Sequence, residues 1–194
     1  MTEDEVREVF RACGAVLNGH FVLSSGRHSA TFLQKARVFM RPDATERLCS
    51  ALADRIADEV DGPIELVVGP ALGGIVPAYE TARHLRVPSV WVEREGGQFQ
   101  LRRFEVAEGT RCVVVEDIVT TGLSIREAVE CLRGEGLDVA AAACLVDRSA
   151  GGADVGIPLV SLARWSIPSY AADQVPAELA AIPTTDPGSR RLAG

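Results

Sequence analysis

One stretch, residues 111–127 (RCVVVEDIVTTGLSIRE), constrains the fold and the chemistry of this chain more than any other. The apolar, β-branched run over 112–115 predicts a strand buried on both faces of a parallel sheet. Two adjacent acids, Glu116 and Asp117, follow where this strand is expected to end, and a small polar turn then leads into a helix predicted over 123–134. The order is therefore strand, acidic pair, small-residue loop and helix.

The loop after the acidic pair has the properties of an anion-binding site. Backbone N–H groups in a loop and at a helix N-terminus favour a phosphate, and glycine lets the phosphate approach the backbone closely. The residues that would hold it are Thr120, Thr121, Gly122, Leu123 and Ser124. The two acids cannot serve the same phosphate because like charges repel, so they need hydroxyl groups or a metal ion. A ribose 5-phosphate carries hydroxyls beside a phosphate and satisfies both requirements.

Strand patterns alternate with helix patterns along most of the chain, which predicts a doubly wound α/β domain with a mostly parallel sheet. Strands are expected over 64–68, 88–92, 112–115, 139–146 and 159–163, and helices over 2–12, 42–60, 76–85 and 123–134. Such sheets bind their ligands at the carboxyl ends of the strands. The loops expected at that edge are 69–74, 94–103, 116–124 and 147–149.

Three other segments have distinct patterns. Residues 19–35 predict two short strands joined by a Ser-Gly turn, which taken alone could be a plain surface hairpin. The polar stretch 94–109, with its paired glycines, predicts a long mobile loop of the kind that closes over a ligand. One helical turn is expected within 168–176, and the tail from Pro183 is expected to be loosely ordered.

Composition narrows the class of protein. The net charge of −7 makes nucleic acid an unsuitable main partner, because its phosphates would repel the chain. No apolar run approaches the roughly 18 residues of a membrane span, and the acidic start MTEDEVREVF is unlike a signal peptide. The five cysteines are scattered without metal-ligand spacing, as expected of reduced thiols in a cytoplasmic protein. Lys35 is the only lysine among the 20 basic residues.

The segment VVVEDIVTTGLS (113–124) resembles, at every position of the pattern, the ribose-phosphate signature of type I phosphoribosyltransferases. The segment FVLSSGRHS, followed by FLQKAR, resembles the N-terminal hood of orotate phosphoribosyltransferases, in which a hairpin closes over the pyrimidine. The resemblance extends from Phe10 to Arg164. It implies transfer of the phosphoribosyl group from phosphoribosyl pyrophosphate to orotate, with Mg²⁺ as cofactor, by a cytoplasmic homodimer.

The resemblance also implies a single phosphoribosyltransferase domain over residues 1–194. Its hood would occupy about 1–40, its core about 41–165 and its C-terminal tail 166–194. The Mg²⁺ ion would be held mainly by pyrophosphate oxygens and ribose hydroxyls, with few direct protein ligands. Asp117, through a water molecule, is the candidate protein ligand.

The same resemblance implies roles for residues at two loops. Glu116 and Asp117 would accept hydrogen bonds from the ribose hydroxyls and favour the positive charge that develops on the ring. The loop that matches the family's pyrophosphate cradle contains Ala71, Leu72 and Gly73, often with a strained non-proline peptide at the first of these steps.

Orotate would be bound from two sides. Arg148 matches the family's base-binding arginine, although its position after a strand also suits a surface arginine paired with Asp147. Phe32 and Leu33 match hood positions against the pyrimidine ring, and they equally suit plain core residues. Ser24 stands in the hood where better-known relatives carry a lysine.

The mobile loop departs from the pattern of those relatives, which carry an Arg-Lys-x-x-Lys-x-His run there and a lysine at the position of Gly73. Only Arg94 of that run is kept in this chain. Arg102 and Arg103 are therefore the cations expected to serve the leaving pyrophosphate, and their alternative is a pair of solvated charges on a strand edge. Two other functions stay open: transfer to another base, and a non-catalytic sensor that binds phosphoribosyl pyrophosphate.

Overall fold

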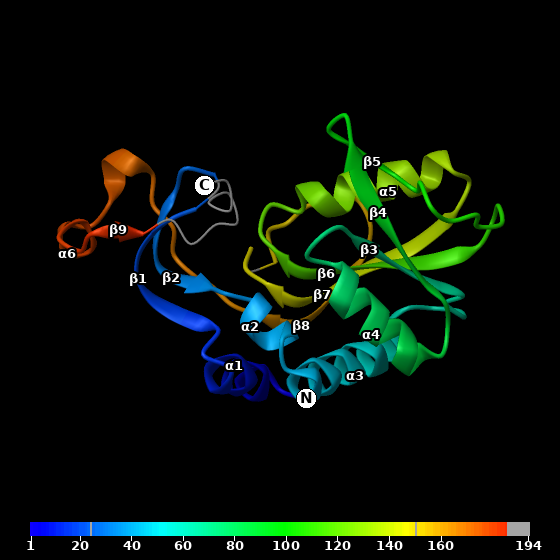
Figure 1. Cartoon of the computed structure of the whole chain (residues 1–194), viewed down its shortest axis with the longest axis horizontal. Coiled ribbons are helices and arrows are strands. Elements are labelled where there is room, and N and C mark those ends of the chain that lie inside the picture. The colour runs from blue at the N-terminus through cyan, green and yellow to red at the C-terminus, as the bar shows by residue number, and fades with distance from the viewer. Residues whose placement is uncertain (24, 150, 186–194) are drawn as a thin grey trace.

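A computed structural model describes residues 1–23, 25–149 and 151–185 and contains two β-sheets with covering helices (Figure 1). The larger sheet has six strands in the order β5-β4-β3-β6-β7-β8. Their bounds are β3 Leu66–Pro70, β4 Ser89–Glu95, β5 Gln98–Gln100, β6 Arg111–Val119, β7 Asp138–Asp147 and β8 Leu159–Arg164. Neighbouring strands run parallel except β4 and β5. The predicted doubly wound, mostly parallel α/β fold is confirmed.

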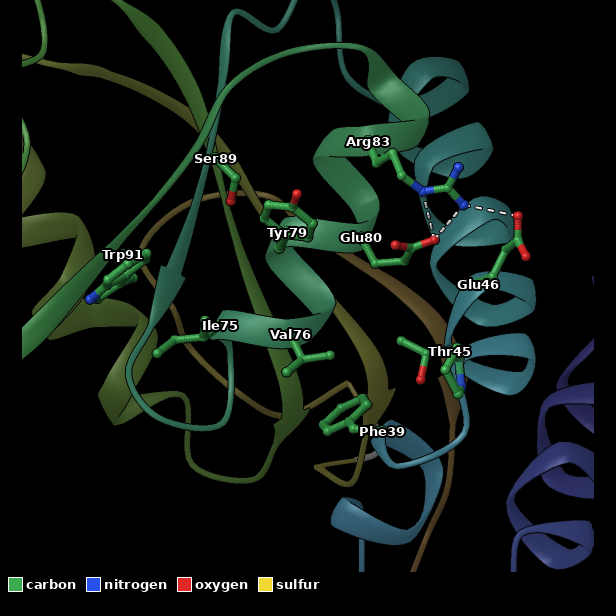
Figure 2. A pocket seen from close by; sticks show the side chains of 11 residues that line it. Phe39, Thr45, Glu46, Ile75, Val76, Tyr79, Glu80, Arg83, Ser89 and Trp91 are labelled. Atoms are coloured by element: carbon green, nitrogen blue, oxygen red, sulfur yellow. Dashed lines mark hydrogen bonds and ion pairs between the residues drawn. The ribbon is translucent and has the colours of Figure 1, made fainter.

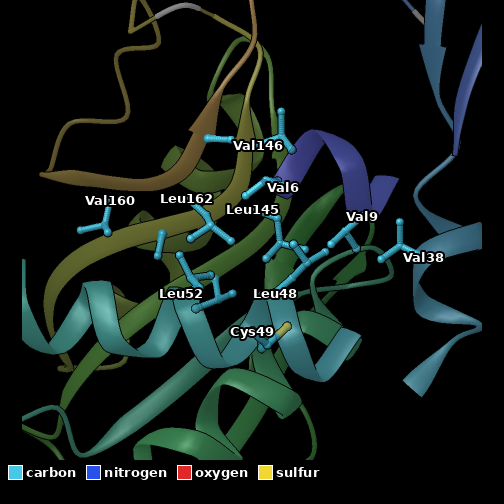
Figure 3. Packing of buried hydrophobic residues seen from close by; sticks show 14 of the residues in the cluster. Val6, Val9, Val38, Leu48, Cys49, Leu52, Leu145, Val146, Val160 and Leu162 are labelled. Atoms are coloured by element: carbon cyan, nitrogen blue, oxygen red, sulfur yellow. The ribbon is translucent and has the colours of Figure 1, made fainter. Parts of the chain in front are cut away.

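Helices cover both faces of the large sheet (Figure 1). One face carries α1 (Glu3–Ala12), α3 (Pro42–Glu59) and α4 (Ile75–Leu85), and the other carries α5 (Leu123–Gly134). Side chains of β6 alternate between the faces, so Val113 joins the core cluster under α3 and Val114 joins the cluster under α5. Figure 3 shows the first cluster, in which Val6 and Leu48 pack with Leu145 of β7. Burial on both faces explains why these strands are continuously apolar.

A small three-stranded sheet lies beside the large one, in the order β2-β1-β9 (Figure 1). Its strands β1 (Val16–Val22) and β2 (His28–Leu33) are antiparallel, which confirms the predicted hairpin, and β9 (Thr184–Thr185) joins β1 in parallel. The remaining elements are α2 Ala36–Phe39, η1 Ala172–Gln174, which is the predicted single turn, and α6 Ala177–Ala180. Among the described residues, no helix combines the length and the hydropathy that crossing a membrane requires.

The strand β9 corrects one expectation about the tail. This strand belongs to the segment from Pro183 that was expected to be loosely ordered, whereas it pairs with β1. The His20 ring of β1 also lies 3.0 Å from the carbonyl oxygen of Ile182, just before β9. The prediction is therefore wrong for β9, because the edge of the hairpin has backbone groups that need partners. The rest of the tail, 186–194, lies outside the described residues.

Strand β6 is longer than predicted. It pairs with β3 on one side and with β7 on the other, and its pairing with β7 continues to Val119. Glu116 and Asp117 therefore lie inside the strand and not after it. The pairing with β3 ends at Val114, so the hydrogen bonds to β7 keep the acids in extended conformation, which apolar patterning alone could not predict.

The predicted mobile loop over 94–109 is partly a hairpin. Strand β4 continues to Glu95 and pairs with β5 after a two-residue turn. The turn residues Gly96 and Gly97 have φ values of +59° and +90°. Positive φ at both central residues is what the tightest hairpin turns require, so the paired glycines make a turn here and not a flexible hinge.

Candidate active site

Two loops meet at the centre of the large sheet, where the chain changes direction. From β3 the chain passes through α4 to β4, and from the neighbouring β6 it passes through α5 to β7 on the opposite side. The carboxyl ends of β3 and β6 thus lie next to each other, which is the usual position of a ligand in doubly wound sheets. The predicted loops 69–74 and 116–124 are the ones brought together.

A small cleft of about 50 Å³ lies at the loop between β6 and α5. Its lining includes all five residues predicted to hold a phosphate, Thr120, Thr121, Gly122, Leu123 and Ser124. The backbone of Gly122 has φ +78°, and a Cβ added there would lie 2.7 Å from the side chain of Val155. The turn itself and the packing against the next loop therefore require this glycine, a reason that sequence reasoning missed.

The acidic pair occupies two different environments although its members are adjacent. Asp117 is 1% exposed, whereas Glu116 is 9% exposed and lines the phosphate cleft. Burial, together with the neighbouring carboxylate of Asp117, raises the pKa of Glu116 to about 8. Glu116 is therefore mainly protonated at neutral pH. The raised pKa of Glu116 shows that two adjacent negative charges are unfavourable here. The expectation that both acids accept hydrogen bonds from ribose hydroxyls stays a prediction.

Lys35 brings the hood segment to Asp117. Its Nζ atom lies 2.5 Å from Asp117 Oδ2 as an ion pair, but it is not aligned as a hydrogen bond. The other carboxylate oxygen, Oδ1, accepts a hydrogen bond of 2.6 Å from the Ile118 backbone N–H. The buried Oδ2 atom has no aligned hydrogen bond among the described residues and has only the Lys35 ammonium beside it, so a ligand hydroxyl can add a hydrogen bond there. Sequence reasoning gave Lys35 no role, and its being the sole lysine was the available signal.

The predicted pyrophosphate loop follows β3 and contains a cis peptide between Ala71 and Leu72, at the step that the resemblance implied. A Cβ at Gly74 would lie 2.8 Å from the carbonyl oxygen of Val115. This glycine therefore permits close packing of the loop on β6. At Gly73 an added Cβ would instead overlap Asp117 Oδ2, so this glycine borders the acidic pair.

Arg148 follows β7 at the same edge of the sheet. Its Nε atom is buried without a hydrogen-bond partner among the described residues, and burial lowers the pKa of its guanidinium. The Asp147 carboxylate instead accepts hydrogen bonds from the backbone N–H groups of Ser149 and Gly151, at 2.8 and 3.0 Å. The alternative of a surface arginine paired with Asp147 is therefore wrong. Arg148 stays a candidate for binding an anionic base.

The hood residues predicted to contact the base differ in their surroundings. Leu33 is 4% exposed and belongs to the core cluster that includes α1, which favours its alternative as a core residue. Phe32 is half-buried, and its ring lies 5.7 Å from the ring of Phe21 between centroids. Ser24 lies outside the described residues.

The loop arginines Arg94, Arg102 and Arg103 are exposed, but each has an acidic partner. Arg94 pairs with Glu127 of α5. Arg102 Nε lies 3.3 Å from Glu95, and Arg103 Nε donates a hydrogen bond of 2.8 Å to Glu93. Glu95 and Glu93 both belong to β4. Exposed ion pairs contribute only about 0–1 kcal/mol, so a polyanionic ligand can compete for these arginines.

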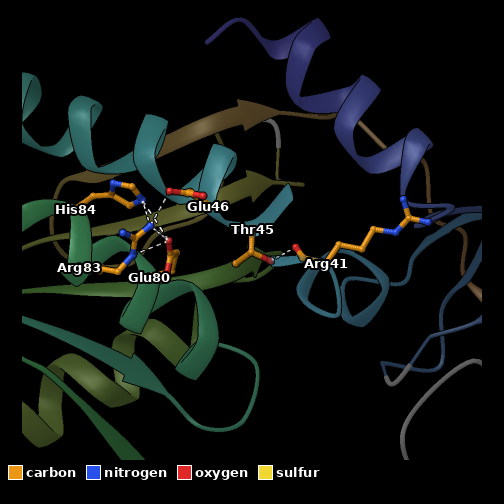
Figure 4. Close-up of polar contacts among 6 residues, drawn as sticks. All are labelled: Arg41, Thr45, Glu46, Glu80, Arg83 and His84. Atoms are coloured by element: carbon orange, nitrogen blue, oxygen red, sulfur yellow. Dashed lines mark hydrogen bonds and ion pairs between the residues drawn. The ribbon is translucent and has the colours of Figure 1, made fainter. Parts of the chain in front are cut away.

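A second, larger cavity of about 430 Å³ is lined by residues of α3, α4 and β4, among others (Figure 2). Apolar side chains such as Ile75, Val76 and Tyr79 form much of its lining. At its polar rim, Arg83 bridges Glu80 and Glu46 at 2.6 and 2.9 Å (Figure 4). These carboxylates, with His84, have the spacing of metal ligands, but the Arg83 guanidinium already neutralises them.

A family model, curated relatives and solved structures all match this chain to the same family. Residues 41–166 match the family model described as a phosphoribosyl transferase domain. The chain is 63% identical to orotate phosphoribosyltransferase 2 of Mesorhizobium japonicum, over 99% of this chain and 100% of that protein. It is 62% identical, over the same shares, to the orotate phosphoribosyltransferase of Brucella anthropi. Its fold is similar to the orotate phosphoribosyltransferase structure from Aeropyrum pernix, with a TM-score of 0.70, 33% identity, and coverage of 82% of this chain and 93% of that one.

Proposed function

The chain belongs to the phosphoribosyltransferase family, and from this premise we propose that it transfers the 5-phosphoribosyl group from phosphoribosyl pyrophosphate to orotate. The products are orotidine 5′-monophosphate and pyrophosphate, in pyrimidine biosynthesis. The observation that carries the proposal is the junction of the phosphate cleft, Asp117 and the pyrophosphate loop at the ends of β3 and β6. The full-length identity to orotate phosphoribosyltransferases supports orotate as the base.

The residues divide the work between binding and charge stabilisation. The 120–124 loop holds the 5-phosphate, and the Asp117 Oδ2 atom, beside the Lys35 ammonium, accepts a hydrogen bond from a ribose hydroxyl. The bond from ribose C1 to pyrophosphate breaks with its electron pair leaving on oxygen, while an orotate nitrogen bonds to C1 and loses its proton to solvent. The Asp117 charge favours the positive ring at this stage; charged hydrogen bonds of this kind contribute about 1.5–3 kcal/mol.

Binding of the base relies on the opposite side of the site. The buried guanidinium of Arg148 pairs with the orotate carboxylate, which supplies the partner that its Nε atom lacks. Phe32 lies against the ring of the base from the hood. We assign the hood to residues about 1–40, the core to about 41–165 and the C-terminal tail to 166–194. The tail contributes β9 to the small sheet of the hood.

The donor set of the site fits a divalent metal that is held by the substrate. Carboxylate oxygens are the ligands that Mg²⁺ prefers, but Glu116 is mainly protonated and Asp117 is already paired with Lys35. We therefore propose Mg²⁺ bound mainly through pyrophosphate and ribose oxygens, with Asp117 contributing through water. When bound, the ion neutralises charge on the leaving pyrophosphate.

The apolar surface around α4 supports a homodimer. Tyr79 is 67% exposed and Val76 is 43% exposed, and both line the 430 Å³ cavity. Contiguous exposed apolar side chains commonly mark an interface. The five free cysteines support a reducing, cytoplasmic location. The acidic net charge argues against nucleic acid as a partner, and we propose no membrane partner.

Pyrophosphate release tests the proposal. The purified chain is incubated with phosphoribosyl pyrophosphate and orotate, uracil, adenine, guanine or hypoxanthine, each with and without Mg²⁺. Among these incubations, we expect pyrophosphate release only in the one that contains both orotate and Mg²⁺. Release with a different base would show another phosphoribosyltransferase, and binding of phosphoribosyl pyrophosphate without release would show a sensor.

A further inference from the structure

Lys35 lies where three parts of the site meet. It immediately precedes α2, and its ammonium reaches the carboxylate of Asp117 in β6. A Cβ built on Gly73, in the pyrophosphate loop, would lie 2.9 Å from Lys35 Nζ. The ammonium therefore occupies the border between the residue that faces the ribose and the loop that faces pyrophosphate.

We propose that the Lys35 ammonium contacts the departing pyrophosphate and stabilises its negative charge, an inference that rests on the proposed function. The side chain of Lys35 is 41% exposed, whereas that of Asp117 is 1% exposed. An ammonium has three N–H donors, and its exposed side can reach a ligand while the other side faces Asp117. A cation beside the oxygen that gains the electron pair lowers the barrier for bond breaking.

The other candidate cations are less well placed. Arg102 and Arg103 are paired with acids of β4, so they must exchange partners before they can meet pyrophosphate. Lys35 needs no such exchange of position because its Nζ atom is already at the pyrophosphate loop. When a ribose hydroxyl also binds Asp117 Oδ2, the Lys35 ammonium stays beside this carboxylate and gains a pyrophosphate oxygen as a second partner.

The absence of a side chain at Gly73 leaves room for the Lys35 ammonium beside Asp117. Any side chain at this position would overlap the Asp117 carboxylate and crowd the ammonium. A residue without a side chain thus leaves the space that the lysine from the hood enters. The hood thereby supplies a charged group to the chemistry as well as a cover for the base.

The test compares Lys35→Met with the control Arg37→Met, which also removes one positive charge. Arg37 is an exposed residue of α2, and within the described part of the chain its side chain donates a hydrogen bond only to the Gly14 carbonyl. We expect Lys35→Met to lower kcat for pyrophosphate release at least 30-fold and to change the KM for orotate less than threefold. Arg37→Met should stay within threefold of the unmodified enzyme. Ethylammonium should restore part of the kcat of Lys35→Ala, a response that a purely structural role would not give.

Equal kcat for Lys35→Met and Arg37→Met would overturn the inference. If Lys35→Met does not fold, Lys35→Arg keeps the charge, and its kcat must exceed that of Lys35→Ala. If the unmodified enzyme has no turnover with orotate, the proposed function fails separately. Calorimetric binding of pyrophosphate with Mg²⁺ then decides: tenfold weaker binding by Lys35→Met supports the contact, and unchanged binding refutes it.

Discussion

The backbone N–H of Asp117 donates a hydrogen bond of 3.0 Å to Glu116 Oε1, so the two acids of β6 hold each other in place. Only one of them faces Lys35. The pair is therefore asymmetric: Glu116, whose pKa is raised, lines the cleft at the 120–124 loop, and Asp117 faces Lys35 beside the pyrophosphate loop.

Glu116→Gln should make the free energy of unfolding less dependent on pH. The folded-state pKa of Glu116, about 8, lies above the ordinary value of 4.5, so the folded protein binds the proton more tightly than the unfolded chain. The contribution of Glu116 to stability is therefore lost as pH rises from about 4.5 to about 8. We expect the variant to gain on the order of a few kcal/mol over the unmodified protein across this window, measured by urea unfolding. Parallel curves from pH 5 to 9 would contradict this.

Asp117→Asn should lower kcat at least tenfold, which is about 1.4 kcal/mol of transition-state stabilisation. The amide keeps the shape of the carboxylate, but it accepts weaker hydrogen bonds and lacks the charge that favours the ring cation. Asp138→Asn is the matched control, because Asp138 is exposed and pairs with Arg111 at the other end of the strands. Circular dichroism checks folding. Unchanged kinetics in the Asp117 variant would remove this residue from the site.

Arg148→Ala should raise the KM for orotate much more than the KM for phosphoribosyl pyrophosphate. Only the base loses its charged partner, and hydrogen bonds to charged groups contribute roughly 1.5–3 kcal/mol, or about ten- to a hundredfold in KM. Arg164→Ala, an exposed arginine at the end of β8, is the control. A parallel rise of both constants would instead assign Arg148 to the support of the fold.

Arg102→Ala and Arg103→Ala should each lower kcat by ten- to a thousandfold, about 1.4–4 kcal/mol, with much smaller effects on orotate affinity. A guanidinium fork binds phosphate oxygens well and stays charged in the working pH range. The variants Glu95→Gln and Glu93→Gln release these arginines from their ion pairs and should not lower kcat. If the double alanine variant turns over normally, the arginines are solvated charges on a strand edge.

Gly122→Ala should destabilise the protein by roughly 1–3 kcal/mol, because φ +78° is unfavourable for alanine and the new methyl group meets Val155. Adding Val155→Ala should relieve the clash but not the backbone strain. Thermal unfolding of the single and double variants separates the two effects. No loss of stability in the single variant would show that the turn adapts.

The sequence predicted the central architecture because its buried strands and amphipathic helices have strong periodic patterns. The helix after Gly122 and the hairpin near the N-terminus are examples. The length of β6 escaped prediction because pairing with β7, and not the apolar pattern, continues the strand through Glu116 to Val119. That residues 120–124 line one cleft was predictable because they are adjacent in sequence, and their binding of a phosphate stays a prediction.

The contacts between distant segments were not predictable. Lys35 reaches Asp117 only after the hood and the core have come together, and no residue spacing in the sequence predicts this contact. The same holds for the acidic partners of the loop arginines, since the antiparallel β4–β5 pairing decides which charges face each other. Leu33 and Phe32 look alike in sequence, and the alternation of a strand gives them different surroundings.

The parallel pairing of β9 with β1 has a consequence for the order of folding. These strands come from nearly opposite ends of the chain. The six-stranded sheet has all its strands by Arg164, so a growing chain on the ribosome has the complete core sequence before β9 is synthesised. Closing so long a loop costs chain entropy that only the assembled core can offset. We therefore expect the small sheet to be completed last, after the six-stranded sheet has formed.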